Sequence, residues 1–255
     1  MGNERIPEAR NEIVLKDLVK HYGDVKAVNG LDLEIRRGEM FGFLGPNGAG
    51  KTTTISMLCG LLKPTSGTAQ IGGFDIRREP QKAKALIGVC PQEAAVFKFL
   101  TGMENLELFG NLYGLDRAVL KKRTAELVDQ ADFAEAARRR AKGYSGGMMR
   151  QLNLLIALIS DPEIVFLDEP TVGMDARARR RTWEYIGSLK GEGKTVILTT
   201  HYIEEAQSLS DRVGIIDYGE LIALGSPEEL MEEHGAQDLE GVFLEITGRR
   251  IAEGS

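Results

Sequence analysis

Residues Gly45 to Thr52 spell G-P-N-G-A-G-K-T, and this stretch constrains the fold more than any other. It matches the pattern G-x-x-x-x-G-K-[ST] of a phosphate-binding loop. The apolar run MFGFLG precedes it and the helix-like run TTTISMLCGLL follows it, which is the strand–loop–helix context that the pattern requires. The sequence therefore predicts a P-loop nucleoside triphosphatase core.

The residue types in this loop suit a triphosphate. Gly45, Gly48 and Gly50 lack a Cβ, so backbone N–H groups can surround phosphate oxygens, and the next helix points its positive end at them. Lys51 adds a point charge, and the hydroxyl of Thr52 can bind Mg²⁺. We expect the nucleotide to be held by the whole loop: Gly45, Pro46, Asn47, Gly48, Ala49, Gly50, Lys51, Thr52 and Thr53.

Compact apolar runs recur along the chain as MFGFLG, IGVC, IVFLDEP, TVILTTH and VGIIDYG. Runs of this kind fit strands that are buried on both faces of a mainly parallel sheet. Residues 12–40 alternate like an N-terminal antiparallel β subdomain, whereas residues from about 98 to 160 have helical periodicity. We therefore expect an α/β fold with an all-helical subdomain inserted into it.

Two features of the C-terminal region are also predicted. Ser226 and Pro227 suit the N-cap and first turn of a helix. The run GVFLEITG indicates one more strand.

Two adjacent carboxylates end the run IVFLDEP. Asp168 is placed to hold Mg²⁺ through its water shell, and Glu169 is placed to polarise an attacking water molecule. Beside a P-loop, this pair points to hydrolysis of the nucleotide rather than to a simple strand-end turn.

The composition excludes several classes of protein. The chain has 255 residues, a net charge of −6 and two cysteines, Cys59 and Cys90, in apolar surroundings. The negative charge disfavours binding to nucleic acid, and buried thiols fit a reducing compartment. The polar start MGNERIPEAR lacks the apolar stretch of a signal peptide, and no run approaches the length of a membrane span. These features predict a cytoplasmic protein.

With GPNGAGKTT, YSGGM and FLDEPT in this order, residues 12–230 resemble the ATP-binding subunit of an ATP-binding cassette (ABC) transporter. The resemblance implies an ATPase that uses ATP and Mg²⁺, with residues 231–255 as a short tail. It implies that Tyr22 stacks on adenine, that Gln92 contacts Mg²⁺ and the lytic water, and that His201 contacts the γ-phosphate. Thr52, Gln92 and Asp168 would be the groups around the metal, and Glu169, Gln92 and His201 the catalytic groups.

The resemblance also explains why a Ser-Gly-Gly turn follows the glycine-rich loop. Ser145, Gly146 and Gly147 match the family's signature turn, and Val172 to Asp175 match the loop that crosses to a second subunit. In the family, each ATP lies between the P-loop of one subunit and the signature turn of the other. A homodimer is therefore expected, with Ser145, Gly146, Gly147 and Asp175 acting on the partner's nucleotide.

One residue departs from the usual signature. Met148 stands where the family usually has Gln, and methionine cannot donate to ribose or phosphate. The form YSGGM, together with the tail LEGVFLEITGR, resembles a subgroup that exports drugs, antibiotics, lipids or polysaccharides, although most of that subgroup's longer C-terminal extension is missing.

The resemblance implies integral membrane partner subunits, with this chain bound peripherally at the cytoplasmic face. A partner helix could dock on Val96, Phe97, Phe99 and Leu100, which could equally belong to the core of the helical lobe. The basic runs Arg138–Lys142 and Arg177–Arg181 are either solvated helix surface or contacts for anionic headgroups or an acidic loop.

Two rival functions remain. A soluble cassette ATPase acting on nucleic acid or ribosomes usually carries two cassettes, a coiled-coil insertion or basic extensions, which this chain lacks. A regulatory module that binds ATP without hydrolysis would not need Glu169 and His201.

Overall fold

The computed structural model describes residues 11–93 and 95–248, and its centre is a six-stranded sheet in the order β10-β9-β3-β8-β7-β6. All neighbouring strands in it are parallel except the pair β9 and β10. The strands are β3 (Met40–Leu44), β6 (Ile87–Cys90), β7 (Ile164–Asp168), β8 (Thr195–Thr200), β9 (Arg212–Asp217) and β10 (Glu220–Gly225). Strands β3, β7 and β8 are buried along their whole length, as the apolar runs predict.

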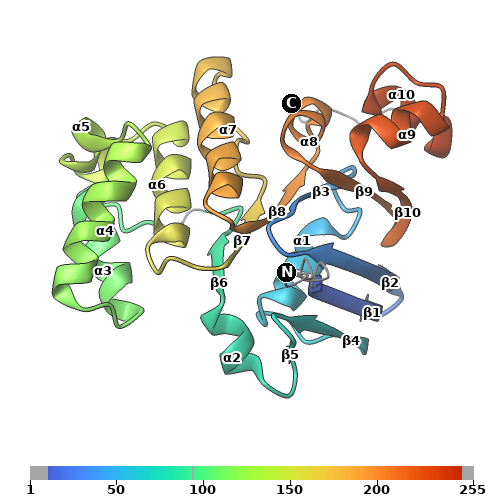
Figure 1. The fold of residues 1–255 in the computed structure, drawn as a ribbon, viewed down its shortest axis with the longest axis horizontal. Coiled ribbons are helices and arrows are strands. Elements are labelled where there is room, and N and C mark those ends of the chain that lie inside the picture. The colour runs from blue at the N-terminus through green and yellow to red at the C-terminus, as the bar shows by residue number, and fades with distance from the viewer. Residues whose placement is uncertain (1–10, 94, 249–255) are drawn as a thin grey trace, which may run out of the picture.

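A second sheet is antiparallel, with the order β2-β1-β4-β5. It consists of β1 (Asn11–Tyr22), β2 (Val25–Arg36), β4 (Ser66–Ile71) and β5 (Phe74–Asp75). Its inner face joins helix α1 (Lys51–Leu58) and one face of the parallel sheet in a single apolar cluster, to which Phe41 and Phe43 belong. Figure 1 shows α1 between the two sheets.

The long connection between β6 and β7 is helical. It contains α3 (Gly102–Leu112), α4 (Arg117–Gln130), α5 (Ala134–Ala137), the short 3-10 helix η1 (Ala141–Gly143) and α6 (Gly146–Leu158). Thr101 and Glu104 form a capping box at the start of α3. Figure 1 shows α3 to α5 standing away from both sheets, with α6 nearest to them. Helix α6 packs against the other face of the parallel sheet, where Leu152, Val165 and Leu198 share a cluster.

The remaining helices lie around the parallel sheet. They are α2 (Pro80–Ala85), α7 (Ala176–Gly191), α8 (Ile203–Leu209), α9 (Pro227–Glu233) and α10 (Leu239–Thr247). Ser226 caps α9 in a capping box with Glu229, and Pro227 occupies the first turn, as predicted.

The prediction of a strand over GVFLEITG is wrong, because this segment lies in helix α10. Leu239, Val242 and Phe243 recur at helical spacing and are buried with Leu44 and Ile215. Asp238 caps the helix by accepting a hydrogen bond from the N–H of Gly241, and Gly248 ends it with a φ of 69°.

The fold class predicted from the sequence is confirmed: a mainly parallel sheet, an antiparallel N-terminal sheet and a helical insertion between β6 and β7. Strands β4, β5 and β10 were not predicted. Across residues 11–93 and 95–248, no helix has the length and apolar character needed to cross a bilayer. Cys59 and Cys90 are both buried and free, as expected.

Candidate nucleotide-binding and hydrolysis site

The glycine-rich loop joins β3 to α1 and is shaped by its surroundings. A Cβ at Gly45 would lie 2.2 Å from the carbonyl oxygen of Ile216, and a Cβ at Gly50 would lie 2.3 Å from that of Ala27. Gly50 also has a φ of 106°, which strains any other residue. Gly48 has a φ of 83° and open space around it. Gly45 and Gly50 are therefore required by packing, and Gly48 keeps the cavity side of the loop open.

Lys51 begins helix α1 beneath this loop and is 5% exposed. Its Nζ donates to the carbonyl oxygens of Gly45 at 2.7 Å and Pro46 at 3.1 Å. Burial lowers the pKa of Lys51, and the nearby carboxylates of Glu169 and Asp168 oppose this change. A cavity of about 250 Å³ lies over the loop and is lined by residues 47–53, Gln92 and Glu169.

Asp168 lies at the carboxyl end of β7, on the rim of this loop. Its Oδ1 accepts hydrogen bonds from Thr52 Oγ1 at 3.1 Å and from Thr199 Oγ1. Burial raises the pKa of Asp168, and the two hydroxyl donors oppose the rise. Asp168 pairs with Thr199 in the β7–β8 register, so the sheet itself sets this contact.

Glu169 follows in a left-handed conformation, with a φ of 49°. Its N–H donates to the carbonyl oxygen of Thr199 at 3.1 Å. Its side chain accepts from Gln92 Nε2 at 3.1 Å and contacts His201 Nδ1 at 3.0 Å. Burial favours the neutral acid, but the hydrogen bond from His201 and the charges of His201, Lys51 and Arg150 together lower the pKa of Glu169.

The predicted catalytic residues therefore meet in space although they lie far apart in the sequence. Gln92, Glu169 and His201 form one hydrogen-bonded set beside the P-loop cavity. Because a carboxylate only accepts, Nδ1 of His201 carries the proton in this contact. Its other ring nitrogen, Nε2, is buried and has no hydrogen-bond partner among the described residues.

Tyr22 is half exposed at the β1–β2 turn and does not line the cavity over the loop, so its contact with adenine stays a prediction. Thr199 was not predicted as a site residue, although it contacts both Asp168 and Glu169. The repeated threonines at the end of TVILTTH were the available signal.

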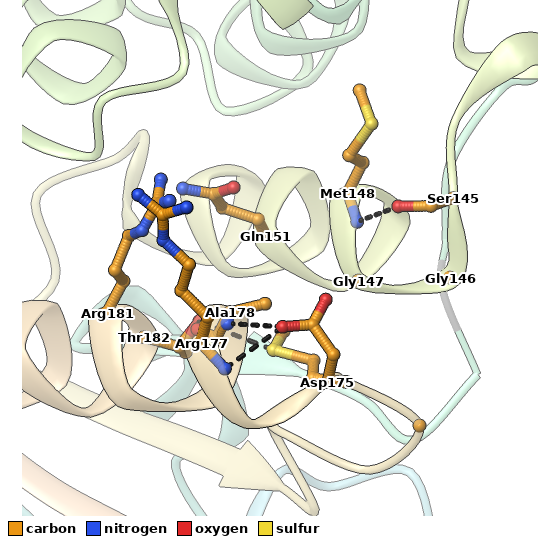
Figure 2. Close-up of a pocket in the computed structure, with 12 residues that line it drawn as sticks. Ser145, Gly146, Gly147, Met148, Gln151, Asp175, Arg177, Ala178, Arg181 and Thr182 are labelled. Carbon is orange, nitrogen blue, oxygen red and sulfur yellow. Dashed lines mark hydrogen bonds between the residues drawn. The ribbon is translucent and has the colours of Figure 1, made fainter.

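A second cavity, of about 450 Å³, opens at the start of helix α6. Ser145 caps α6 by accepting a hydrogen bond from the N–H of Met148 at 3.3 Å, and Gly146 and Gly147 form the first turn. Figure 2 shows Asp175 facing this turn from the start of α7, where it accepts from the N–H groups of Arg177 and Ala178. The side chains of Arg177 and Arg181 also line this cavity.

The two cavities have no lining residue in common. One chain therefore gathers the P-loop, Asp168, Glu169, Gln92 and His201 in one place, and Ser145, Gly146, Gly147 and Asp175 in another. The second set therefore forms a cavity of its own in the single chain.

The parallel sheet, the loop that cradles phosphate and the carboxylates beside it define a P-loop ATPase. The family model described as "ABC transporter" matches residues 28–172, and the chain belongs to this family as an ATP-binding, ATP-hydrolysing subunit.

Curated relatives agree with this assignment. The chain is 44% identical over 237 residues to the daunorubicin resistance ATP-binding protein DrrA3 of Streptomyces coeruleorubidus, covering 93% of this chain and 75% of that protein. It is also 44% identical over 233 residues to the linearmycin resistance ATP-binding protein LnrL of Bacillus subtilis, covering 91% and 74%. Its homologues thus include ATP-binding proteins of drug and antibiotic resistance.

Solved structures share the fold. An ATP-binding subunit of an ABC transporter superposes with a TM-score of 0.83 at 26% identity, over 92% of this chain and 99% of that one. The dimeric post-hydrolysis state of the ATP-binding cassette MJ0796 bound to ADP and phosphate gives a TM-score of 0.77 at 26% identity, over 84% and 98%.

Proposed function

We propose that two copies of this chain close around two ATP molecules and drive export through membrane partner subunits. The observation that carries this proposal is the separation of the two cavities in one chain. The Ser145 turn offers a helix N-terminus and open N–H groups, which suit an anion. It would serve the triphosphate bound to the P-loop of the second copy. The dimeric state of MJ0796 supports this arrangement.

In each composite site, the P-loop residues Gly45 to Thr53 would bind the triphosphate. Lys51 would exchange its contacts with the carbonyl oxygens of Gly45 and Pro46 for phosphate oxygens, which are better partners for an ammonium group. His201 Nε2 has no other hydrogen-bond partner among the described residues, so in the imidazolium form, with a proton on both ring nitrogens, it would donate to the γ-phosphate. Tyr22 would stack on the adenine with its half-exposed ring.

Glu169 is the proposed general base. Because its pKa lies below the ordinary value, the carboxylate is ionised at neutral pH and can accept a proton from water. Gln92 and His201 hold its two oxygens in fixed positions, which orients the base before reaction.

The donor set also fits Mg²⁺. Thr52 Oγ1 and Asp168 Oδ1 lie 3.1 Å apart, and oxygen donors of this kind are those that Mg²⁺ prefers. We propose that Thr52, Asp168 and Gln92 hold this ion or its water shell. When bound, Mg²⁺ would neutralise charge on the phosphates.

The membrane partners would dock beside Gln92. Phe97 and Phe99 are 54% and 74% exposed, whereas Val96 and Leu100 are partly buried, so the four residues divide between surface and core. Lys142 lies over the ring of Phe99, with its Nζ 5.8 Å from the ring centroid. This aromatic and basic surface suits a helix from a membrane subunit and would keep the chain at the cytoplasmic face.

Export of a drug-like or antibiotic substrate is supported by the resistance proteins among its relatives. The rival reading, a soluble cassette ATPase acting on nucleic acid, has no such support. The division into a cassette of residues 12–230, with a helical subdomain at about 98–160 and a tail at 231–255, remains a prediction.

Substitution Glu169→Gln tests the proposal. Loss of the base should lower kcat by about 10²-fold or more while ATP still binds. Size-exclusion chromatography should then show a dimer in ATP and a monomer without it. Glu107→Gln, on the exposed face of α3, is the matched control. A Glu169→Gln protein that stays monomeric in saturating ATP contradicts the two-copy site.

A further inference from the structure

One carboxyl group outside both cavities is almost wholly buried. Glu205 lies in α8, four residues after His201, and is 1% exposed. Its Oε1 accepts hydrogen bonds from Thr171 Oγ1 at 2.7 Å and from Trp183 Nε1 at 2.8 Å. Burial raises the pKa of Glu205, against the effect of its hydrogen-bond donors. Burying such a group is costly, so its partners are expected to fix it firmly.

The two donors come from the segment that joins the two cavities. Thr171 lies between Glu169 and Asp175, and its carbonyl oxygen accepts from the N–H of Met174 at 3.1 Å. Trp183 lies in α7, the helix that Asp175 caps. A single carboxyl oxygen of Glu205 therefore joins α8 to both the residue 171–175 loop and α7.

A second set of contacts joins the same elements. The guanidinium carbon of Arg179 in α7 lies 5.3 Å from the ring centroid of Tyr202 and 5.8 Å from that of Trp183. The ring of Tyr202 lies 4.3 Å from that of His201, centroid to centroid. Trp183 therefore links Glu205 to Arg179. Arg179 lies over Tyr202, whose ring faces that of His201. His201 in turn contacts Glu169.

We propose that Glu205 is a positioning residue that makes the His201 loop and the residue 171–175 loop move as one unit. The inference rests on the two-copy site proposed above. In that site, His201 serves the nucleotide of its own chain, whereas Asp175 lines the cavity that serves the other nucleotide. Glu205 therefore couples the state of the γ-phosphate in one composite site to the geometry of the second. A two-state element biased by a γ-phosphate contact would thereby communicate between sites.

The test compares Glu205→Ala with Glu205→Gln and with Glu204→Ala, a change at the exposed neighbour in the same helix. Glu205→Ala should lower kcat on the order of tenfold, because the buried hydroxyl of Thr171 and the half-buried indole N–H of Trp183 lose their acceptor. It should also lower the Hill coefficient for ATP toward that of independent sites, while KM changes little. Glu205→Gln retains an acceptor oxygen and should restore both values, and Glu204→Ala should leave both unchanged.

Thr171→Val and Trp183→Phe each remove one donor with little change of shape, and they test the same claim if Glu205→Ala does not fold. Each should lower the Hill coefficient in a protein that still unfolds in one cooperative thermal transition. A folded Glu205→Ala protein with normal kcat and Hill coefficient overturns the proposal, as does normal cooperativity in both donor variants. If Glu169→Gln still forms the ATP dimer, such a result leaves the two-copy site intact. If that dimer never forms, the two-copy site is contradicted, and the proposed role of Glu205 is contradicted with it.

Discussion

At the scale of single residues, the site depends on neighbours that compensate for buried charge. Glu169 keeps a low pKa because His201, Lys51 and Arg150 act on it, whereas the hydroxyl donors and the charge of Lys51 do not offset the burial of Asp168. Two adjacent carboxyl groups are thus held with opposite pKa shifts. The lowered pKa keeps Glu169 ionised at neutral pH, which a proton acceptor requires.

The two thiols are predicted to be inert in the native protein. Burial raises the pKa of both Cys59 and Cys90 to about 12, well above any working pH. The thiolate, which is the reactive form, is therefore scarce and also shielded. Ellman's reagent at pH 8 should label neither thiol until the chain is unfolded in urea, when both should react. Rapid labelling of a native thiol would contradict the burial described here.

Much of the site could be predicted from residue order alone. The P-loop pattern requires a strand before it and a helix after it, and both are present as β3 and α1. Glu205 could not be found in this way, and Thr199 had only the repeated threonines of TVILTTH as a signal. Their contacts with Asp168 and Thr171 arise from strand register and helix packing between segments about 30 residues apart, which a local pattern does not encode.

At the scale of secondary-structure elements, the errors are concentrated where apolar runs are short or one-sided. The apolar residues of GVFLEI fit a strand and a helix equally well. Only the contacts with α8, α9 and β9 favour the helix. Strand β10 has no buried residue, which explains why its run ELIALG gave no signal of a buried strand. Buried β3, β7 and β8 were predicted because both their faces are covered.

The cap of α10 can be tested directly. Asp238→Ala removes the acceptor for the N–H of Gly241 and should lower the free energy of unfolding by about 1 kcal/mol. Asp116→Ala is the matched control, because Asp116 occupies the N-cap of α4 without a side-chain cap bond. Urea denaturation followed by circular dichroism compares the two variants. An equal loss for both would show that the Asp238 cap adds nothing.

At the scale of the whole molecule, the two cavities lie apart in one chain. The P-loop cavity and the Ser145 cavity lie on different elements, one between β3 and α1 and the other between α6 and α7. The loop of residues 170–174 connects Glu169 to Asp175, which caps α7, so a shift in one cavity can reach the other along this segment. The fold therefore provides both the parts of a shared site and a path between them.

Mixing two inactive variants tests directly whether each hydrolysis site is built from two copies of the chain. Lys51→Ala disables the P-loop, and Ser145→Arg fills the signature turn; neither homodimer should hydrolyse ATP. In a mixed dimer, the intact P-loop of the Ser145→Arg chain meets the intact Ser145 turn of the Lys51→Ala chain, so one complete site remains. Because of this complete site, mixing should restore steady-state ATP hydrolysis. A mixture as inactive as its components, with mixed dimers shown by mass spectrometry, would contradict it.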